Sequence, residues 1–285
     1  MTIYCVLIAN EENSQIEGIG IDEMVKHGLL EPIKNGPVYW IDTADSQPCI
    51  GTGGCAVWTL KATGRKGHSG LPQKAINPIV LCYEAMTEVL RRFHEDFPAH
   101  ENETKWNFLS PSTMKPTSWS YPTGSANQIP QEAQVGGDIR LTPFYDFKEV
   151  IAKVNSYVDD INKDVTKLDT RGPVMTNTLA DGSKGVVSIE WEGEVLNGIA
   201  CNIDGAGQKA IKVVAEEILG EYKPYSITGS LPLVRELQEE GFDIQMVGFG
   251  HSDVYHGLNE YASFSHMEKG FKAFAKIIQI LNKSL

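Results

Sequence analysis

The sequence predicts an α/β protein whose main domain is interrupted by an inserted, ferredoxin-like α+β module. Two observations lead to this fold class. Short β-branched, apolar runs at residues 3–9 and 38–41 flank a helical segment capped by Asp22, which is typical of a βαβ unit and a parallel sheet. From about residue 54 the pattern changes to β-α-β-β-α-β, which is the order of a split βαβ module.

The inserted module is expected to span residues 54–198. Its strands and helices follow from hydrophobic periods of two or about 3.6 residues. In chain order we expect a half-exposed strand at 57–63, a helix with an apolar stripe from Ile79 to Phe93, a strand at 134–141, a helix at 147–161 and a strand at 186–191. A Pro/Ser/Thr-rich stretch occupies residues 110–130, and residues 162–184 are expected to form a surface excursion.

The main domain is expected to be built from residues 1–53 and 199–285. After the module, the sequence predicts a helix at 206–219, a helix after Leu231 and a strand at 243–247. The last helix is amphipathic, and its apolar stripe is expected to face the core. The residues of this stripe are Met267, Phe271, Phe274, Ile278 and Leu281.

Composition argues against two classes of partner. The 285 residues include 25 basic and 37 acidic side chains, a net charge of −12, without the Lys/Arg cluster that nucleic-acid phosphates require. No apolar run reaches the roughly 20 residues of a membrane span, and the N-terminal residues lack the basic flank and cleavage site of a secretory signal. Five cysteines without a CxxC motif predict reduced thiols, so we expect a cytoplasmic protein.

Carboxylates lie just after the predicted strands, where α/β sheets bind ligands, and an imidazole lies near the C-terminus. Glu11 and Glu12 follow the first predicted strand, Asp42 follows the second, and His256 lies in the segment YHGLNE (255–260). Ligands bind at the carboxyl ends of such strands, and these side chains are types that hold Zn²⁺ or Co²⁺ in hydrolases. Simpler alternatives remain open, because adjacent glutamates are commonly solvated and a single His is commonly structural.

Seven segments together resemble the peptidase M20 family of metallohydrolases, most closely its eukaryotic acetylornithine deacetylase branch. They stand in the family's order and cover nearly the whole chain. The segments are IANEEN (8–13), IDTADSQPCIGTGG (41–54), GRKGHSGLPQKAINP (64–78), PSTMKPTSWSYPTGSANQIP (111–130), GDIRLTPFYD (137–146), KPYSITGSLPL (223–233) and YHGLNE (255–260).

The resemblance implies a phosphorylase/hydrolase-like catalytic domain interrupted by a lid that forms a homodimer. It implies an enzyme that uses two Zn²⁺ or Co²⁺ ions to remove the acetyl group from N-acetyl-L-ornithine in arginine biosynthesis. Glu11 then matches the general base, and Glu12, Asp42 and His256 match metal ligands.

Further residues match the substrate side of the family's site. His68 matches a lid residue that polarises the scissile carbonyl in the partner subunit's site. Asn127, Arg140, Gly229 and Ser230 match residues near the substrate. For Arg140 a structural ion pair is an open alternative, and for Gly229 and Ser230 a turn before a helix is another.

The family has two further metal-binding pieces ahead of the glutamate pair, an H-x-D motif and a bridging Asp. Only ten residues precede Glu11, so we expect a chain that lacks the N-terminal part of the catalytic domain and binds at most one Zn²⁺ weakly. His94-Glu95-Asp96 and His251-Ser252-Asp253 are the two H-x-D triplets present. The alternatives are another M20 dipeptidase or aminoacylase, or a non-catalytic dimerising homologue.

Overall fold

The computed structural model describes residues 1–9, 11, 19–122, 124–169 and 177–283. Within them the chain divides into two compact units. Unit 1 contains Met1–Gly54, Glu101–Ser110 and Leu196–Leu285, and unit 2 contains Cys55–His100 and Pro111–Val195. Residues 101–110, which the sequence analysis placed in the inserted module, pack with unit 1. Trp106 helps to hold them there, because its indole N–H donates to the carbonyl of Cys201 at 2.9 Å.

Unit 2 has the ferredoxin-like arrangement that the sequence predicts. Its elements are β3 (Gly54–Thr63), α2 (Pro78–Asp96), β5 (Thr113–Ser120), β7 (Glu132–Leu141), α4 (Phe147–Lys163) and β8 (Val186–Leu196). The sheet order is β5-β7-β3-β8, and β5 pairs antiparallel with β7. The first strand of the unit therefore lies between the third and the fourth, so the two βαβ halves interleave, and the predicted fold of the module is confirmed.

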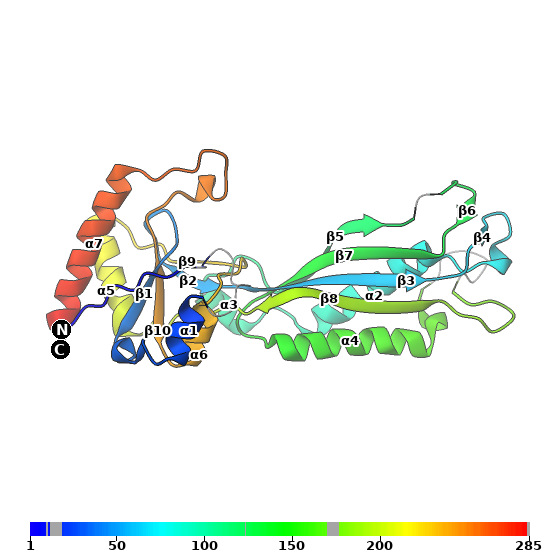
Figure 1. The fold of residues 1–285 in the computed structure, drawn as a ribbon, viewed down its shortest axis with the longest axis horizontal. Coiled ribbons are helices and arrows are strands. Elements are labelled where there is room, and N and C mark those ends of the chain that lie inside the picture. The colour runs from blue at the N-terminus through cyan, green and yellow to red at the C-terminus, as the bar shows by residue number, and fades with distance from the viewer. Residues whose placement is uncertain (10, 12–18, 123, 170–176, 284–285) are drawn as a thin grey trace. The chain divides into compact units, whose positions relative to one another are not determined.

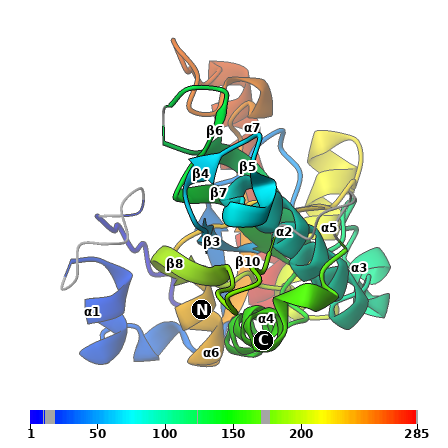
Figure 2. The same cartoon turned by 90° about the vertical axis from the view of Figure 1, so that its right-hand side faces the viewer.

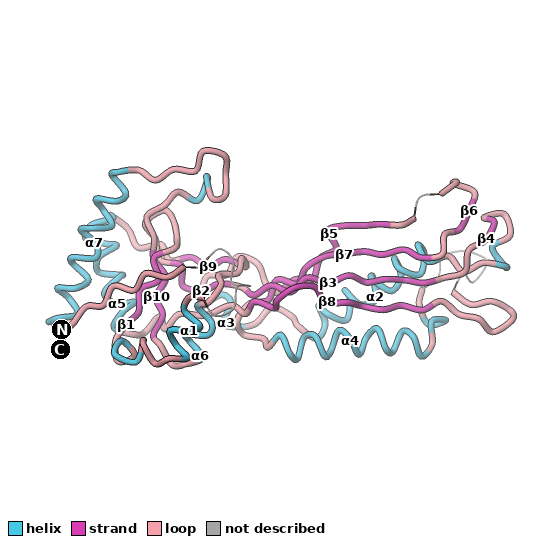
Figure 3. The backbone as a smooth tube through the Cα atoms, viewed as in Figure 1, coloured by secondary structure: helices cyan, strands magenta, loops and turns pink. Residues whose placement is uncertain are grey.

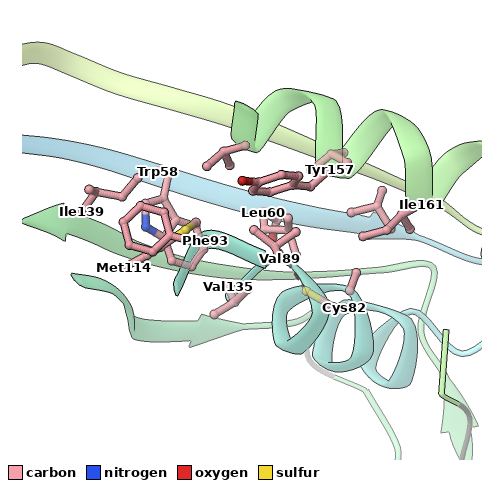
Figure 4. Close-up of a cluster of buried hydrophobic side chains, with 14 of the residues drawn as sticks. Trp58, Leu60, Cys82, Val89, Phe93, Met114, Val135, Ile139, Tyr157 and Ile161 are labelled. Carbon is pink, nitrogen blue, oxygen red and sulfur yellow. Dashed lines mark hydrogen bonds between the residues drawn. The ribbon is translucent and has the colours of Figure 1, made fainter. Parts of the chain in front are cut away.

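The two helices of unit 2 cover one face of its sheet (Figures 1 and 2). Along β3, Trp58 and Leu60 are 1% exposed, whereas Val57, which directly precedes Trp58, is 41% exposed. Successive side chains of a strand point to opposite faces of the sheet. Trp58 and Leu60 pack against Phe93 of α2 and Tyr157 of α4 in one hydrophobic cluster (Figure 4). The opposite face of the sheet carries the more exposed residues of the strands.

Strand β5 was not expected from the sequence, since it lies in the Pro/Ser/Thr-rich stretch. It forms an edge of the sheet, and most of its residues are exposed. An edge strand tolerates Pro116, because one row of its backbone groups needs no partner within the sheet. Amino-acid composition therefore fails to predict a strand here, because β5 is held as a strand by its antiparallel pairing with β7.

Unit 1 is a four-stranded sheet with helices on both faces (Figures 1 and 3). The strand order is β1-β10-β2-β9, with β1 parallel to β10, β10 antiparallel to β2, and β2 parallel to β9. Helices α1 and α6 lie on one face, and α5 and α7 lie on the other. The bounds are α1 (Ile21–Lys26), β1 (Pro37–Ile41), β2 (Cys49–Thr52), α3 (Glu101–Lys105), α5 (Ala206–Val214), β9 (Tyr225–Ile227), α6 (Val234–Glu239), β10 (Asp243–Val247) and α7 (Phe264–Lys283).

Neighbouring strand residues belong to different cores in unit 1. Trp40 packs with α1 and α6, whereas Tyr39 packs against the cluster formed with α5 and α7. Helix α5 continues as a π-helical turn to Leu219, so the helix predicted at 206–219 is confirmed. No helix among the described residues combines the length and the apolar composition needed to cross a membrane.

Three local predictions for unit 1 are wrong. Residues 3–8 form no strand and are mostly exposed, with Leu7 at 89%, because an apolar β-branched run forms a strand only where another strand pairs with it. Helix α1 is capped by Gly20 rather than by Asp22, which lies in the first turn. In α7, Met267 and Phe271 are 54% and 80% exposed, because the buried face runs through Gly270, Ala273 and Ile277.

Candidate active site

Two loops that follow neighbouring parallel strands meet at one edge of the unit 1 sheet. We call them the edge loops: residues 42–48 after β1 and residues 248–263 after β10. The strand pairing continues into them, because the Asp42 amide donates to the carbonyl of Val247 and the Asp45 amide to the carbonyl of Gly250, both at 3.0 Å. The Asp45 carboxylate then accepts from the Ser252 amide at 3.2 Å. Asp42 and the segment leading to His256 thus leave the same sheet edge.

The close approach of the edge loops requires glycine at position 248. A Cβ atom added to Gly248 would lie 1.7 Å from the carbonyl oxygen of Thr43. No side chain can be accommodated at that distance without moving the backbone of one loop. Gly248 therefore sets the spacing between the two loops that carry Asp42 and His256.

Two tyrosines that the sequence analysis missed lie beside the carboxylates of the edge loops. Burial raises the pKa of Tyr255, and the neighbouring Tyr225, Asp42 and Asp45 raise it further. Burial also raises the pKa of Tyr225, the first residue of β9. Both phenols therefore stay protonated near neutral pH and offer O–H donors at this edge. The only sequence signal for Tyr255 is its place next to His256.

His256 and His251 differ in their surroundings. His256 is exposed and adopts a left-handed backbone conformation with φ of 52°. His251 is half-buried and stacks on His266 with ring centroids 4.3 Å apart. Its Nε2 atom is buried without a hydrogen-bond partner among the described residues. The loop thus presents one imidazole to solvent and holds the other against the C-terminal helix.

The donors at this edge fit a divalent metal in kind but do not complete a site. A carboxylate at Asp42 and an imidazole at His256 are ligand types that Zn²⁺ and Co²⁺ accept. Within the described part of the chain, however, no three His, Cys, Asp or Glu side chains lie close enough together to hold an ion. Glu12 lies outside the described residues, whereas Glu11 is described and half-buried.

His68 and Asn127 are brought together in unit 2. The strands β4 (Gly67–His68) and β6 (Gln128–Ile129) form an antiparallel ribbon in which His68 pairs with Gln128 (Figures 1 and 2). The next amide, that of Ser69, donates to the carbonyl of Asn127 at 3.0 Å. His68 and Asn127 are both exposed. We call residues 67–71 and 127–129 the tip ribbon.

Arg140 lies at the other end of the unit 2 sheet. Its guanidinium pairs with Asp138 at 2.7 Å, which is the structural alternative that the sequence left open. Cys55 is the second residue of β3, and burial raises the pKa of its thiol while the positive charge of Arg140 opposes this rise. Arg140 therefore lies near the start of β3. The ten residues of β3 span about 30 Å before the chain reaches the tip ribbon. Within one chain, His68 and Arg140 are therefore too far apart to touch the same small substrate.

Gly229 and Ser230 follow β9 at the opposite edge of the unit 1 sheet from Asp42. Strand β2 runs antiparallel to β10 and parallel to β9, so the carboxyl ends of β2 and β9 point away from those of β1 and β10. The Gly53 amide donates to the carbonyls of Ile227 and Gly229 at 2.8 and 2.9 Å. These bonds hold the segment as a turn, and a role in substrate binding for Gly229 and Ser230 stays a prediction.

The two H-x-D triplets have different environments. In the first, His94 donates from Nδ1 to the carbonyl of Leu90 at 2.7 Å, and Asp96 accepts from the hydroxyl of Tyr157 at 2.5 Å. These contacts give the first triplet a structural role in unit 2. The second triplet, at 251–253, lies in an edge loop.

Comparisons with known proteins relate part of the sequence and the fold to one family. Residues 50–166 match the peptidase dimerisation domain of the M20 type. The M20 family metallo-carboxypeptidase Sso-CP2 from Sulfolobus solfataricus has the same fold, with a TM-score of 0.60 at 14% identity over 95% of this chain and 68% of that one. Residues 50–166 therefore match an M20-type dimerisation domain, and the chain resembles an M20 peptidase in fold.

Sequence identity to two curated relatives is much higher than the 14% identity to Sso-CP2. The chain is 51% identical over 283 residues to acetylornithine deacetylase from Arabidopsis thaliana and 48% identical over 288 residues to acetylornithine deacetylase from Dictyostelium discoideum. Each match covers 99% of this chain and 64% of the relative. The chain therefore spans about two thirds of the length of these relatives.

Substituting Gly248 tests the packing of the edge loops. We expect Gly248→Ala to destabilise unit 1 by about 1–3 kcal/mol, because the added methyl group overlaps the Thr43 carbonyl. Urea unfolding followed by fluorescence measures the change. The matched control is Gly36→Ala, where an added Cβ meets nothing within 4 Å, and its effect should stay within about 0.5 kcal/mol. Equal stabilities of the two variants would contradict the close approach.

Proposed function

We propose that this chain forms part of a metal-dependent amidohydrolase that converts N-acetyl-L-ornithine to acetate and ornithine, in arginine biosynthesis. The observation that carries this proposal is the 51% identity to an acetylornithine deacetylase over 99% of the chain. The edge loops support it, because they place a carboxylate and an imidazole at one sheet edge. The substrate class is a small N-acyl amino acid.

The roles of the residues follow from their chemistry. A divalent metal, when bound, polarises the substrate carbonyl and activates a water molecule, and Zn²⁺ or Co²⁺ is the ion we propose. Glu12, Asp42 and His256 would be ligands of the two ions that the resemblance implies. Glu11 takes the proton from the attacking water and returns it to the leaving amine. His68 donates a hydrogen bond to the carbonyl oxygen as negative charge develops there.

We assign residues 1–53 and 199–285 to the catalytic domain and residues 54–198 to the lid, apart from residues 101–110, which pack with unit 1. We propose that the lid forms a homodimer. Strand β5 supports the lid as the dimer contact, because it is an edge strand with mostly exposed residues. The opposite edge strand, β8, carries Glu190, Glu192 and Glu194, and this charge disfavours pairing there. All five cysteines are free thiols, which agrees with a cytoplasmic location.

Activity is tested on the chain alone and on a chimera that adds the part of the Arabidopsis relative that this chain does not match. With Zn²⁺ or Co²⁺, the chimera should release ornithine from N-acetyl-L-ornithine, measured by amine detection. The chain alone should bind at most one Zn²⁺ in calorimetry, because the described residues contain no group of three His, Cys, Asp or Glu side chains that could hold an ion. Removing the metal with a chelator should abolish turnover.

Matched histidine variants of the chimera make this test specific. His256→Ala should lower kcat by at least about 10²-fold, because a metal ligand is lost. His27→Ala should leave kcat unchanged, since His27 is an exposed residue whose partner is Glu23. Preferential cleavage of dipeptides or of other N-acyl amino acids by a folded, metal-loaded chimera would favour the alternative, another M20 dipeptidase or aminoacylase. A folded chimera that cleaves none of these amides would favour a dimerising homologue without catalytic activity.

The separation of His68 from Arg140 supports action of His68 in the site of the partner subunit. We expect Glu11→Gln and His68→Ala chimeras each to be nearly inactive, with Glu11→Gln losing roughly 10² to 10⁴-fold because Gln cannot accept the proton. After the two variants exchange subunits, random pairing should restore about a quarter of the working sites. If activity stays at the level of the single variants after light scattering and mass spectrometry confirm exchange, His68 does not act in trans.

A further inference from the structure

The tip ribbon holds His68 by backbone contacts on both sides. His68 pairs with Gln128 across the ribbon, and the Leu71 amide donates to the His68 carbonyl at 2.9 Å to close a turn. The Ser69 amide is bonded to the Asn127 carbonyl at 3.0 Å. The backbone on which this exposed imidazole sits is thus bonded on both sides, although the ring itself faces solvent.

A backbone amide also bonds to the ring of His68. The Gly70 N–H donates to Nδ1 of His68, with 3.0 Å between the two nitrogen atoms. A backbone amide can only donate, so Nδ1 must be the acceptor and carries no proton. In the neutral imidazole the hydrogen then resides on Nε2, and the ring presents an N–H donor away from the turn.

The absence of a side chain at Gly70 also favours the hydrogen bond between its amide and the His68 ring. A Cβ atom added to Gly70 would lie 3.2 Å from Nδ1 and 3.3 Å from Cε1 of His68. These separations are tighter than ordinary van der Waals contact, so a larger residue would push the imidazole away from the amide. The Gly70 amide and the absence of a Cβ atom at Gly70 therefore both hold the Nδ1 edge of the His68 ring close to the turn.

We propose that Gly70 is a positioning residue that sets the tautomer of His68, so that Nε2–H is the group offered to the carbonyl oxygen of an amide substrate. The substrate part of this inference rests on the proposed function, whereas the tautomer does not. A donor set in advance costs no reorganisation when the oxygen becomes negative, so the benefit falls on kcat rather than on KM.

Other histidines of the chain supply an internal reference. In His94 and His266, Nδ1 lies 2.7 and 3.2 Å from the carbonyl oxygens of Leu90 and Phe249. A carbonyl only accepts, so these two rings carry the hydrogen on Nδ1 in their neutral form. His68 is expected to show the opposite tautomer in the same spectrum.

The experiment is a long-range ¹H–¹⁵N spectrum of the ¹⁵N-histidine-labelled chain, with the His68 signals assigned by their loss in His68→Gln. The wild-type chain should show an unprotonated Nδ1 and a protonated Nε2 at His68, and the reverse at His94. Gly70→Ala should convert His68 to a mixture of tautomers. Gly124→Ala is the matched control in unit 2, because its added Cβ meets nothing within 4 Å, and it should leave His68 unchanged.

In the chimera described above, Gly70→Ala should lower kcat about tenfold or more with little change in KM. A protonated Nδ1 at His68 in the wild-type chain would overturn the proposal, and so would an unchanged tautomer in Gly70→Ala. If the tautomers behave as expected and the chimera hydrolyses no N-acyl amino acid, the positioning role stands and the proposed function fails.

Discussion

The parallel pairing of β1 with β10 is the interaction on which the first unit depends. Its register runs from Pro37 opposite Asp243 to Ile41 opposite Val247, and an isolated bridge between Ala44 and Gly250 extends it beyond the strands. Because parallel strands end at the same sheet edge, this pairing brings two segments together that are separated by about two hundred residues of sequence. Backbone hydrogen bonds between the two strands therefore continue into the edge loops, which carry Asp42 and His256.

A second constraint organises unit 2, and it separates the candidate residues rather than gathering them. The long strand β3 is fixed by alternate buried residues such as Trp58 and Leu60 against α2 and α4. Its length places the tip ribbon at one end of the sheet and the Arg140–Asp138 pair at the other. This rigid spacing is why an active site that uses His68 and Arg140 together needs two copies of the chain. Under the proposed function, the metal chemistry would belong to unit 1 and the hydrogen-bond donor His68 to unit 2.

The elements with strong periodicity could be predicted from the sequence, and those that depend on a distant partner could not. Strand β10 was predicted at its observed bounds, since DIQMV is a short segment with apolar residues at Ile244, Met246 and Val247 that ends before Gly248. The run at 3–9 is more apolar but has no partner strand among the described residues, and β5 is a strand despite Pro116 and its serines because β7 pairs with it. Composition alone cannot distinguish these cases, because lateral hydrogen bonding decides them.

The candidate site shows the same limit. Asp42 and His256 could be predicted as candidate ligands from their places in the sequence and from the resemblance to M20 enzymes, and these roles stay predictions. Tyr225 and Tyr255 were not, because their significance depends on burial beside Asp42 and Asp45, which only the fold creates. The bond from the Gly70 amide to His68 was equally hidden, since a glycine two residues after a histidine carries no signal until the turn closes.

The most direct test of this account is native-state amide hydrogen exchange at Asp42, Asp45 and Ser252. These amides donate to Val247, Gly250 and the Asp45 carboxylate, respectively. If the β1–β10 pairing extends into the edge loops, Asp42 and Asp45 should be protected with an opening free energy close to that of Met246 in β10, and Ser252 should follow them. Exchange of Asp45 and Ser252 at the rate of unprotected amides, while Met246 stays protected, would contradict the central role of the pairing.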